Sequence, residues 1–223
     1  MKKLISLSLS ILMILTTFFC LPANAFASES GEVGKIENPA YNGETVNYRA
    51  RSLKSNNWMA DQAREFADVL ITRSTEYNFS IPSQSTLTRD QLQESVKQFF
   101  YYATDDSLSV SAVDGDYIRW QVAGYSFSYS YYNNCYNIDM TIYYYDNAKQ
   151  NRQADEEIKA YLSSLDMDSY SDYELLKEFH DHILDICDYN KYNMEADYNS
   201  TAYGVFVVGK AVCQGYALAF YRL

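Results

Sequence analysis

The residues best suited to chemistry lie near the end of the sequence, around Cys213. An apolar run with a glycine turn, Ala202–Gly209, leads into this cysteine, and apolar residues then recur at helical spacing up to Leu223. A cysteine in the first turn of a helix meets unpaired backbone N–H groups and the positive end of the helix dipole, which favour the nucleophilic thiolate. Gly215 lets another backbone or a substrate approach this helix closely. The sequence therefore predicts a cysteine nucleophile at a helix N-terminus, and a buried inert thiol is the alternative.

Two other groups of residues fail the geometric requirements of the chemistry they resemble. His180 and His182 stand two residues apart in a segment of helical period. At about 100° per residue they point to nearly opposite sides and cannot share a metal ion. The acidic run from Asp166 to Glu174 has Tyr170 where a calcium loop needs an oxygen ligand. We expect neither a metal ion nor a cofactor.

Two helices are predicted ahead of the cysteine, and they must position it. Apolar residues from Ile158 to Leu165 repeat with helical period. The stretch Ser171-Asp172-Tyr173-Glu174 is a capping box, which opens a second helix whose apolar residues continue to Ile186. The sequence thus predicts that residues 151–223 form one part of the protein.

Residues 58–150 are predicted to form an N-terminal α+β region. Helical spacing follows Trp58, and a capping box at Thr88–Gln91 opens a second helix. The predicted buried stripe of that second helix comprises Leu92, Val96, Phe99 and Phe100.

The stretch from Leu108 to Tyr145 has a different character. It is dense in aromatic and β-branched residues and is interrupted by Asp114-Gly115 and Asn133-Asn134, a pattern typical of an antiparallel meander of three or four strands. Eight tyrosines lie between Tyr125 and Tyr145. We expect cross-strand tyrosine pairs that cover a half-exposed sheet, and an aromatic platform for sugars or peptides is the alternative.

The first residues predict export. Lys2 and Lys3 precede an apolar run from Leu4 to Leu21 and a small-x-small cleavage pattern at Ala23–Ala25, so residues 1–27 are predicted to be a signal peptide. Residues 28–57 lack apolar periodicity and are rich in Asn, Gly, Glu and Ser, which predicts a linker. No later stretch is long and apolar enough to span a bilayer. We expect a secreted or cell-envelope-associated protein without a transmembrane segment after cleavage.

The charge balance argues against a nucleic acid partner. The 223 residues include 18 Lys and Arg against 29 Asp and Glu, a net charge of −11. Phosphate binding needs clustered basic side chains, which this chain does not offer. The hydrophobic fraction of 48% is that of a folded globular protein.

The cysteine region resembles a known family. The motif Val212–Ala217, preceded by Gly209-Lys210 and Ala202–Gly204, is similar to the nucleophile motif of the bacterial transglutaminase-like superfamily. The stretch from Tyr173 to Ile183, with Asp188-Tyr189 after it, resembles the helix and connection that precede the cysteine in that family. The resemblance covers roughly residues 170–223.

The resemblance implies a fold and a reaction. The implied fold class is α+β with a papain-like architecture, in which Cys213 at a helix N-terminus packs against an antiparallel sheet. The implied reaction is acyl transfer on protein or peptide amides through a thioester at Cys213. The family's sheet supplies a His that shuttles the proton and an Asp that orients it, both later in the chain than the cysteine. The backbone N–H of Cys213 is the implied oxyanion donor.

One departure from the family pattern concerns the base. No histidine follows Cys213 in the sequence, and His180 and His182 lie on the upstream helix. We therefore expect this chain to hold the first half of a transglutaminase-like domain, inactive as given, and the natural reading frame to continue past Leu223. Without the sheet, the cysteine helix is expected to expose an apolar patch. The alternative is a non-catalytic binding or scaffolding module at the cell envelope.

The other two cysteines of the exported chain are Cys135 and Cys187. A free Cys213 leaves them as a possible pair, but they lie in different predicted regions, so both the bridged and the free state stay open.

Overall fold

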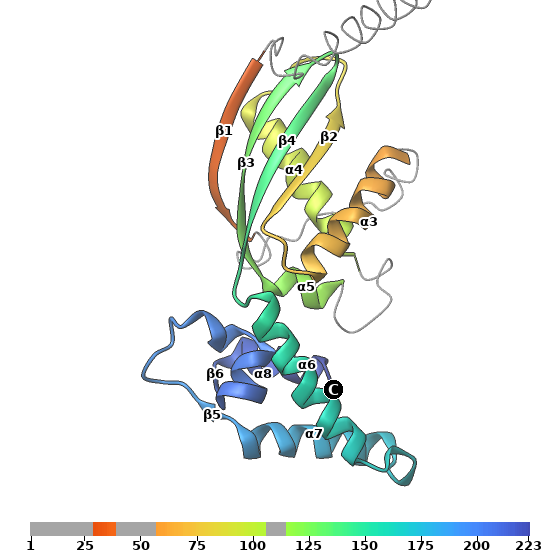
Figure 1. Cartoon of the computed structure of the whole chain (residues 1–223), viewed down its shortest axis with the longest axis vertical. Helices are drawn as coiled ribbons and strands as arrows, with labels where there is room; N and C mark the ends of the chain where they lie inside the picture. The colour runs from red at the N-terminus through yellow and green to blue at the C-terminus, as the bar shows by residue number, and fades with distance from the viewer. Residues whose placement is uncertain (1–28, 39–56, 106–114) are drawn as a thin grey trace, which may run out of the picture.

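The computed structural model describes residues 29–38, 57–105 and 115–223. They form two units that lie end to end along the long axis of the molecule (Figure 1). The sheet unit comprises β1–β4 and α3–α5, and the helical unit comprises α6–α8, β5 and β6. The predicted signal peptide, residues 1–27, lies outside the described residues. Among the helices of the described ranges, none is both long enough and apolar enough to cross a bilayer.

The sheet unit is built on four antiparallel strands in the order β1-β3-β4-β2. Their bounds are β1 Glu29–Glu37, β2 Glu76–Pro82, β3 Val122–Tyr132 and β4 Cys135–Tyr144. The predicted turn at Asn133-Asn134 joins β3 to β4, and both residues have positive φ, 52° and 59°. These dihedrals match the twist of the strands, as in the tight turns of β-hairpins.

Part of the predicted meander is helical. Residues 116–121 form a short helix, α5 (Asp116–Gln121), and Gly115 is its N-cap. Among the described residues of the stretch that we expected to supply three or four strands, β3 and β4 are the strands, and residues 108–114 lie outside the described residues. The other two strands of the sheet come from earlier parts of the chain.

The predicted linker is also wrong where the structure describes it. Residues 29–37 form β1, which pairs with β3 from Glu29 opposite Tyr131 to Glu37 opposite Gly124. Its one buried side chain within the strand is that of Val33. Such a strand is held by its hydrogen-bond ladder to a distant partner, so its own sequence has little apolar signal. Residues 39–56 lie outside the described residues.

Helices α3 (Asn57–Ile71) and α4 (Arg89–Ala103) cover one face of the sheet (Figure 1). The predicted capping box is confirmed, since the Thr88 side chain accepts from the Gln91 N–H and the Gln91 side chain accepts from the Thr88 N–H. The predicted stripe is also confirmed as buried: Leu92, Val96, Phe99 and Phe100. The rings of Phe79 and Phe99, 4.3 Å apart, join β2 to α4 in the core.

The tyrosines of β3 and β4 are divided between the core and the surface, where Tyr132 and Tyr143 are exposed. Tyr125, Tyr131 and Tyr136 are buried in the core that the sheet shares with its helices. Tyr131 and Tyr136 are opposite each other on adjacent strands, with ring centroids 4.7 Å apart, so the expected cross-strand pairing is confirmed. The pairs lie on the covered face rather than on a half-exposed one, because strand side chains alternate and the aromatic set points toward the helices.

The helical unit follows directly on β4. It comprises α6 (Ala148–Ser164), a 3₁₀ turn (Met167–Ser169), α7 (Asp172–Ile186), β5 (Asp188–Tyr189), a 3₁₀ turn (Asp197–Ser200), a π-helical turn (Gly204–Val208), β6 (Lys210–Ala211) and α8 (Cys213–Tyr221). The predicted capping box of α7 is confirmed at Ser171 and Glu174. A small core forms where Ile183 of α7 meets Val205 and Ala219.

Two buried arginines tie the units together. Arg73, just after α3, pairs with Asp146 at the start of the helical unit, with Nε 2.6 Å from Oδ1. Arg222, just after α8, pairs with Asp155 of α6 and donates to the Tyr117 hydroxyl of α5 at 3.0 Å. The mixed α and β architecture with an antiparallel sheet agrees with the expected α+β class.

Candidate cysteine site at the start of helix α8

Cys213 is the first residue of α8, as the sequence predicts. The N-cap residue Val212 has extended backbone and makes no side-chain capping bond. The Cys213 thiol is free and exposed to solvent. The burial that the alternative predicts for this thiol is therefore wrong.

The first turn of α8 is fixed by close backbone packing. A Cβ atom placed on Gly215 would overlap the Asn199 carbonyl and come within 2.8 Å of the Ala211 Cβ. The same Asn199 carbonyl accepts from the Val212 N–H at 3.1 Å, and the Asn199 side chain accepts from the buried Asn190 amide at 2.9 Å. The lack of a side chain at Gly215 therefore lets another backbone segment approach α8 closely, as the sequence predicts. That segment is the protein's own chain at Asn199.

An apolar pocket of about 510 Å³ opens beside the cysteine. It is lined by Tyr117, Trp120, Cys213, Gln214, Ala217, Leu218 and Tyr221. Two of these residues, Tyr117 and Trp120, belong to α5 of the sheet unit. The Gln214 side-chain amide donates to the Trp120 carbonyl at 3.0 Å, which fixes the two walls relative to each other.

Sequence reasoning missed α5 as part of this site because it assigned residues 116–121 to a strand. The helical spacing of the buried residues Tyr117, Ile118 and Gln121 was the signal for a helix. Burial raises the pKa of the Tyr117 hydroxyl, so this group stays protonated and accepts from Arg222 behind the pocket.

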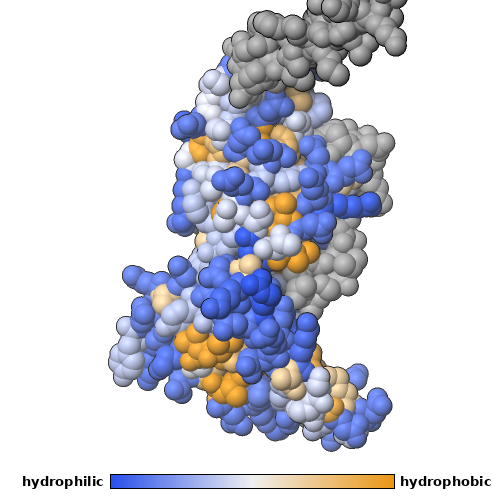
Figure 2. Space-filling view, in the orientation of Figure 1, coloured by the Kyte–Doolittle hydropathy of each residue, from blue (hydrophilic) through white to orange (hydrophobic). Residues whose placement is uncertain are grey.

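Exposed apolar side chains surround the cysteine helix. Val207, Val208, Phe220 and Tyr221 are all exposed. Figure 2 shows hydrophobic residues gathered on the surface of the helical unit, over the part where β6 and α8 lie in Figure 1. The expected apolar patch is thus confirmed.

The two histidines of the sequence lie in different surroundings, and neither lines the pocket. His180 is exposed, with Nδ1 3.0 Å from Oδ1 of Asp181. His182 is half-buried and stacks on Tyr161, with ring centroids 3.6 Å apart. The two histidines of α7 therefore contact different residues.

The His182 contact predicts a pH dependence of stability. Burial lowers the pKa of His182 in the folded protein, so the unfolded chain binds a proton more readily. We expect stability to fall as pH drops through the ordinary His value of about 6.5 and below it. Urea titrations at pH 7.5 and pH 5 should show a smaller midpoint difference for His182→Gln than for the wild type. An equal pH dependence in both proteins would contradict this assignment, and His180→Gln is the matched control.

The remaining cysteines are free. Cys135 begins β4 in the sheet unit, whereas Cys187 is buried after α7 in the helical unit. The Cys187 carbonyl accepts from the Tyr216 hydroxyl at 2.6 Å, and burial raises the pKa of the Cys187 thiol. Of the bridged and free states that the sequence left open for Cys135 and Cys187, the structure has the free state.

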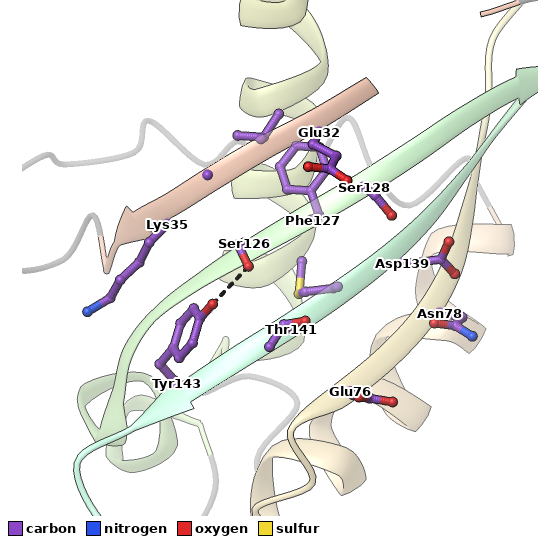
Figure 3. A pocket seen from close by; sticks show the side chains of 13 residues that line it. Glu32, Lys35, Glu76, Asn78, Ser126, Phe127, Ser128, Asp139, Thr141 and Tyr143 are labelled. Atoms are coloured by element: carbon purple, nitrogen blue, oxygen red, sulfur yellow. Dashed lines mark hydrogen bonds between the residues drawn. The ribbon is translucent and has the colours of Figure 1, made fainter. Parts of the chain in front are cut away.

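A second, larger depression lies on the outer face of the sheet. It measures about 600 Å³, and Figure 3 shows Ser126, Thr141 and other short polar side chains between the longer Glu32 and Glu76 of the edge strands. The Ser126 and Tyr143 hydroxyls are hydrogen-bonded at 3.1 Å. Neither a cysteine nor a histidine is among the residues that line this depression.

The described residues contain no group of three or more His, Cys, Asp and Glu side chains arranged to hold a metal ion. The acidic run that begins at Asp166 forms a 3₁₀ turn and the exposed start of α7.

Comparison with known proteins found no family model and no curated protein that matches the chain.

Proposed function

We propose that this chain carries the nucleophile of an exported transglutaminase-like cysteine acyltransferase or amidohydrolase with a papain-like fold. The proposed substrates are amides of proteins or peptides. The observation that carries the proposal is the exposed thiol of Cys213, which stands at the first residue of α8 on the edge of an apolar pocket.

The proposed reaction uses the start of α8 twice. The Cys213 thiolate attacks the amide carbonyl carbon, and the Cys213 N–H donates to the oxygen, which becomes negative in the tetrahedral intermediate. The carbon–nitrogen bond then breaks, the nitrogen takes a proton, and ammonia or an amine leaves. A second amine or water attacks the resulting thioester and releases the thiol together with a new amide or an acid.

The reaction also needs a group that accepts and returns the proton. Neither His180 nor His182 lines the pocket, and their contacts are with Asp181 and Tyr161. The residues that line the pocket therefore supply no histidine for the role of the base in the proposed reaction. The given chain is then expected to be inactive by itself.

The composition of the pocket favours one other function. The side chains that line it include no carboxylate, imidazole or ammonium group. An apolar pocket without acid–base groups suits a non-catalytic binding or scaffolding module, in which Cys213 has no chemical role.

The two functions predict different thiol reactivities. A nucleophile in the first turn of a helix reacts as the thiolate, so under the enzyme proposal we expect iodoacetamide to alkylate Cys213 rapidly even below pH 7. The measurement is the alkylation rate of each cysteine between pH 5.5 and 8.5, read by peptide mass spectrometry. The partly exposed Cys135 is the internal reference. Because only the thiolate reacts, the alkylation rate of an ordinary thiol falls about tenfold for each pH unit below neutrality. A Cys213 rate that falls in the same way would contradict the enzyme proposal and support the binding module.

A further inference from the structure

The pocket beside Cys213 has walls from both units. Tyr117 and Trp120 come from α5, and Ala217, Leu218 and Tyr221 come from α8. Figure 1 shows α5 at the end of the sheet unit that faces the helical unit. Three of the seven lining residues are aromatic, and none carries a charge. The charged groups of Arg222 and Asp155 lie behind Tyr117, paired with each other.

We infer that this pocket binds an aromatic or large aliphatic side chain of the substrate, next to the amide that Cys213 attacks. The inference rests on the proposed function, because it takes the thiol on the pocket edge as the reacting atom. The volume of about 510 Å³ lies within the range of small-molecule pockets. Aromatic walls favour a ring through burial and through offset or edge-to-face contact, and a charged side chain would lose its hydration there without gaining a partner.

The inference gives α5 a role in specificity. The Gln214 amide holds the Trp120 carbonyl, and Arg222 holds the Tyr117 hydroxyl, so both ends of this wall are fixed to α8 and its continuation. The sheet unit thereby contributes the wall that faces the nucleophile, and the two units form one site. Trp120 is a specificity residue in this scheme and takes no part in bond breaking.

The test compares three reagents that share one reactive group. Iodoacetamide is small, its N-phenyl derivative iodoacetanilide carries a ring, and iodoacetate carries a negative charge. Each rate at Cys213, read by mass spectrometry, is divided by the rate of the same reagent with glutathione. We expect a phenyl preference of about tenfold, equivalent to about 1.4 kcal/mol, and a rate for iodoacetate below that for iodoacetamide.

Three variants distinguish the effect of the pocket on the phenyl preference from the general reactivity of the Cys213 thiol. Trp120→Ala removes one wall, and Ala217→Glu puts a carboxylate on the exposed face of α8 inside the pocket, so each is expected to abolish the phenyl preference. Phe220→Ala is the matched control, because Phe220 is exposed on the same helix but does not line the pocket. Its phenyl preference should equal that of the wild type.

Three results would overturn the inference. They are a wild-type phenyl preference near one, an unchanged preference in both pocket variants, and a concentration-dependent dimer whose formation blocks the pocket. A preserved phenyl preference with slow alkylation by all three reagents has a different meaning. It would support the apolar pocket and contradict the proposed function, because the thiol would then lack the reactivity of a nucleophile.

Discussion

Cys213→Ala should abolish both glutamine–amine transfer and amide hydrolysis by any active form of this protein. The substitution removes the atom that forms the thioester, and the backbone N–H and the pocket alone cannot replace it. Loss of the nucleophile in a related acyl-transfer mechanism lowers kcat by about 10⁶-fold, which would place the variant below detection. The measurement is incorporation of a fluorescent amine into a glutamine-containing protein, together with ammonia release in the absence of the amine.

The control for this result is a cysteine that plays no part in the proposed chemistry. Cys135→Ala lies in the sheet unit and should keep activity close to that of the wild type. Because the Cys213 side chain is exposed, its substitution should change the free energy of unfolding by no more than about 0.5 kcal/mol. A Cys213→Ala protein that is folded and still active would end the enzyme proposal.

Asp146→Ala should lower the free energy of unfolding by about 3–5 kcal/mol, the cost of leaving a buried charge without its partner. The side chains of Arg73 and Asp146 are only 2% and 1% exposed, and Nε lies 2.6 Å from Oδ1. Arg73 also donates to the Leu70 carbonyl, and its backbone has φ of 59°, so it cannot easily turn out to solvent. The loss should weaken the joint between the sheet unit and the helical unit.

Urea unfolding, followed by circular dichroism and tyrosine fluorescence, measures this effect. The matched control is Asp181→Ala, which breaks the exposed pair of Lys177 and Asp181 and should shift the urea midpoint far less than Asp146→Ala does. The double variant Arg73→Met with Asp146→Leu should regain most of the loss, because it leaves no unpaired buried charge. A cost for Asp146→Ala similar to that of Asp181→Ala would contradict the structural role of the buried pair.

Features governed by near neighbours in the sequence were predictable. The capping boxes at Thr88 and Ser171, the buried stripe of α4 and the Asn133-Asn134 turn depend on residues within a few positions of one another. The position of Cys213 at the start of α8 belongs to the same class, since Gly209 before it and the apolar period after it are local signals.

Features fixed by distant partners were not predictable in the same way. Strand β1 has one buried side chain, and it is stabilised by its backbone hydrogen bonds to β3. The paired residues run from Glu29 with Tyr131 to Glu37 with Gly124, so they lie far apart in the sequence. Strand β2 did carry a signal, the alternation of the buried residues Tyr77, Phe79 and Ile81, that the sequence analysis did not use. The pocket is the clearest case, because the contact between Trp120 and Gln214 joins elements 94 positions apart.

The two edges of the sheet have a consequence for how copies of this protein behave in concentrated solution. Within the part of the chain that the structure describes, β1 and β2 are the outermost strands, and an outermost strand is the position where a strand of another molecule could be added. β1 carries Glu29, Glu32, Lys35 and Glu37, and β2 begins with Glu76 and ends with Pro82. Mutual repulsion of these carboxylates, together with a proline that has no N–H to donate, opposes fibril growth from a hairpin so rich in tyrosine.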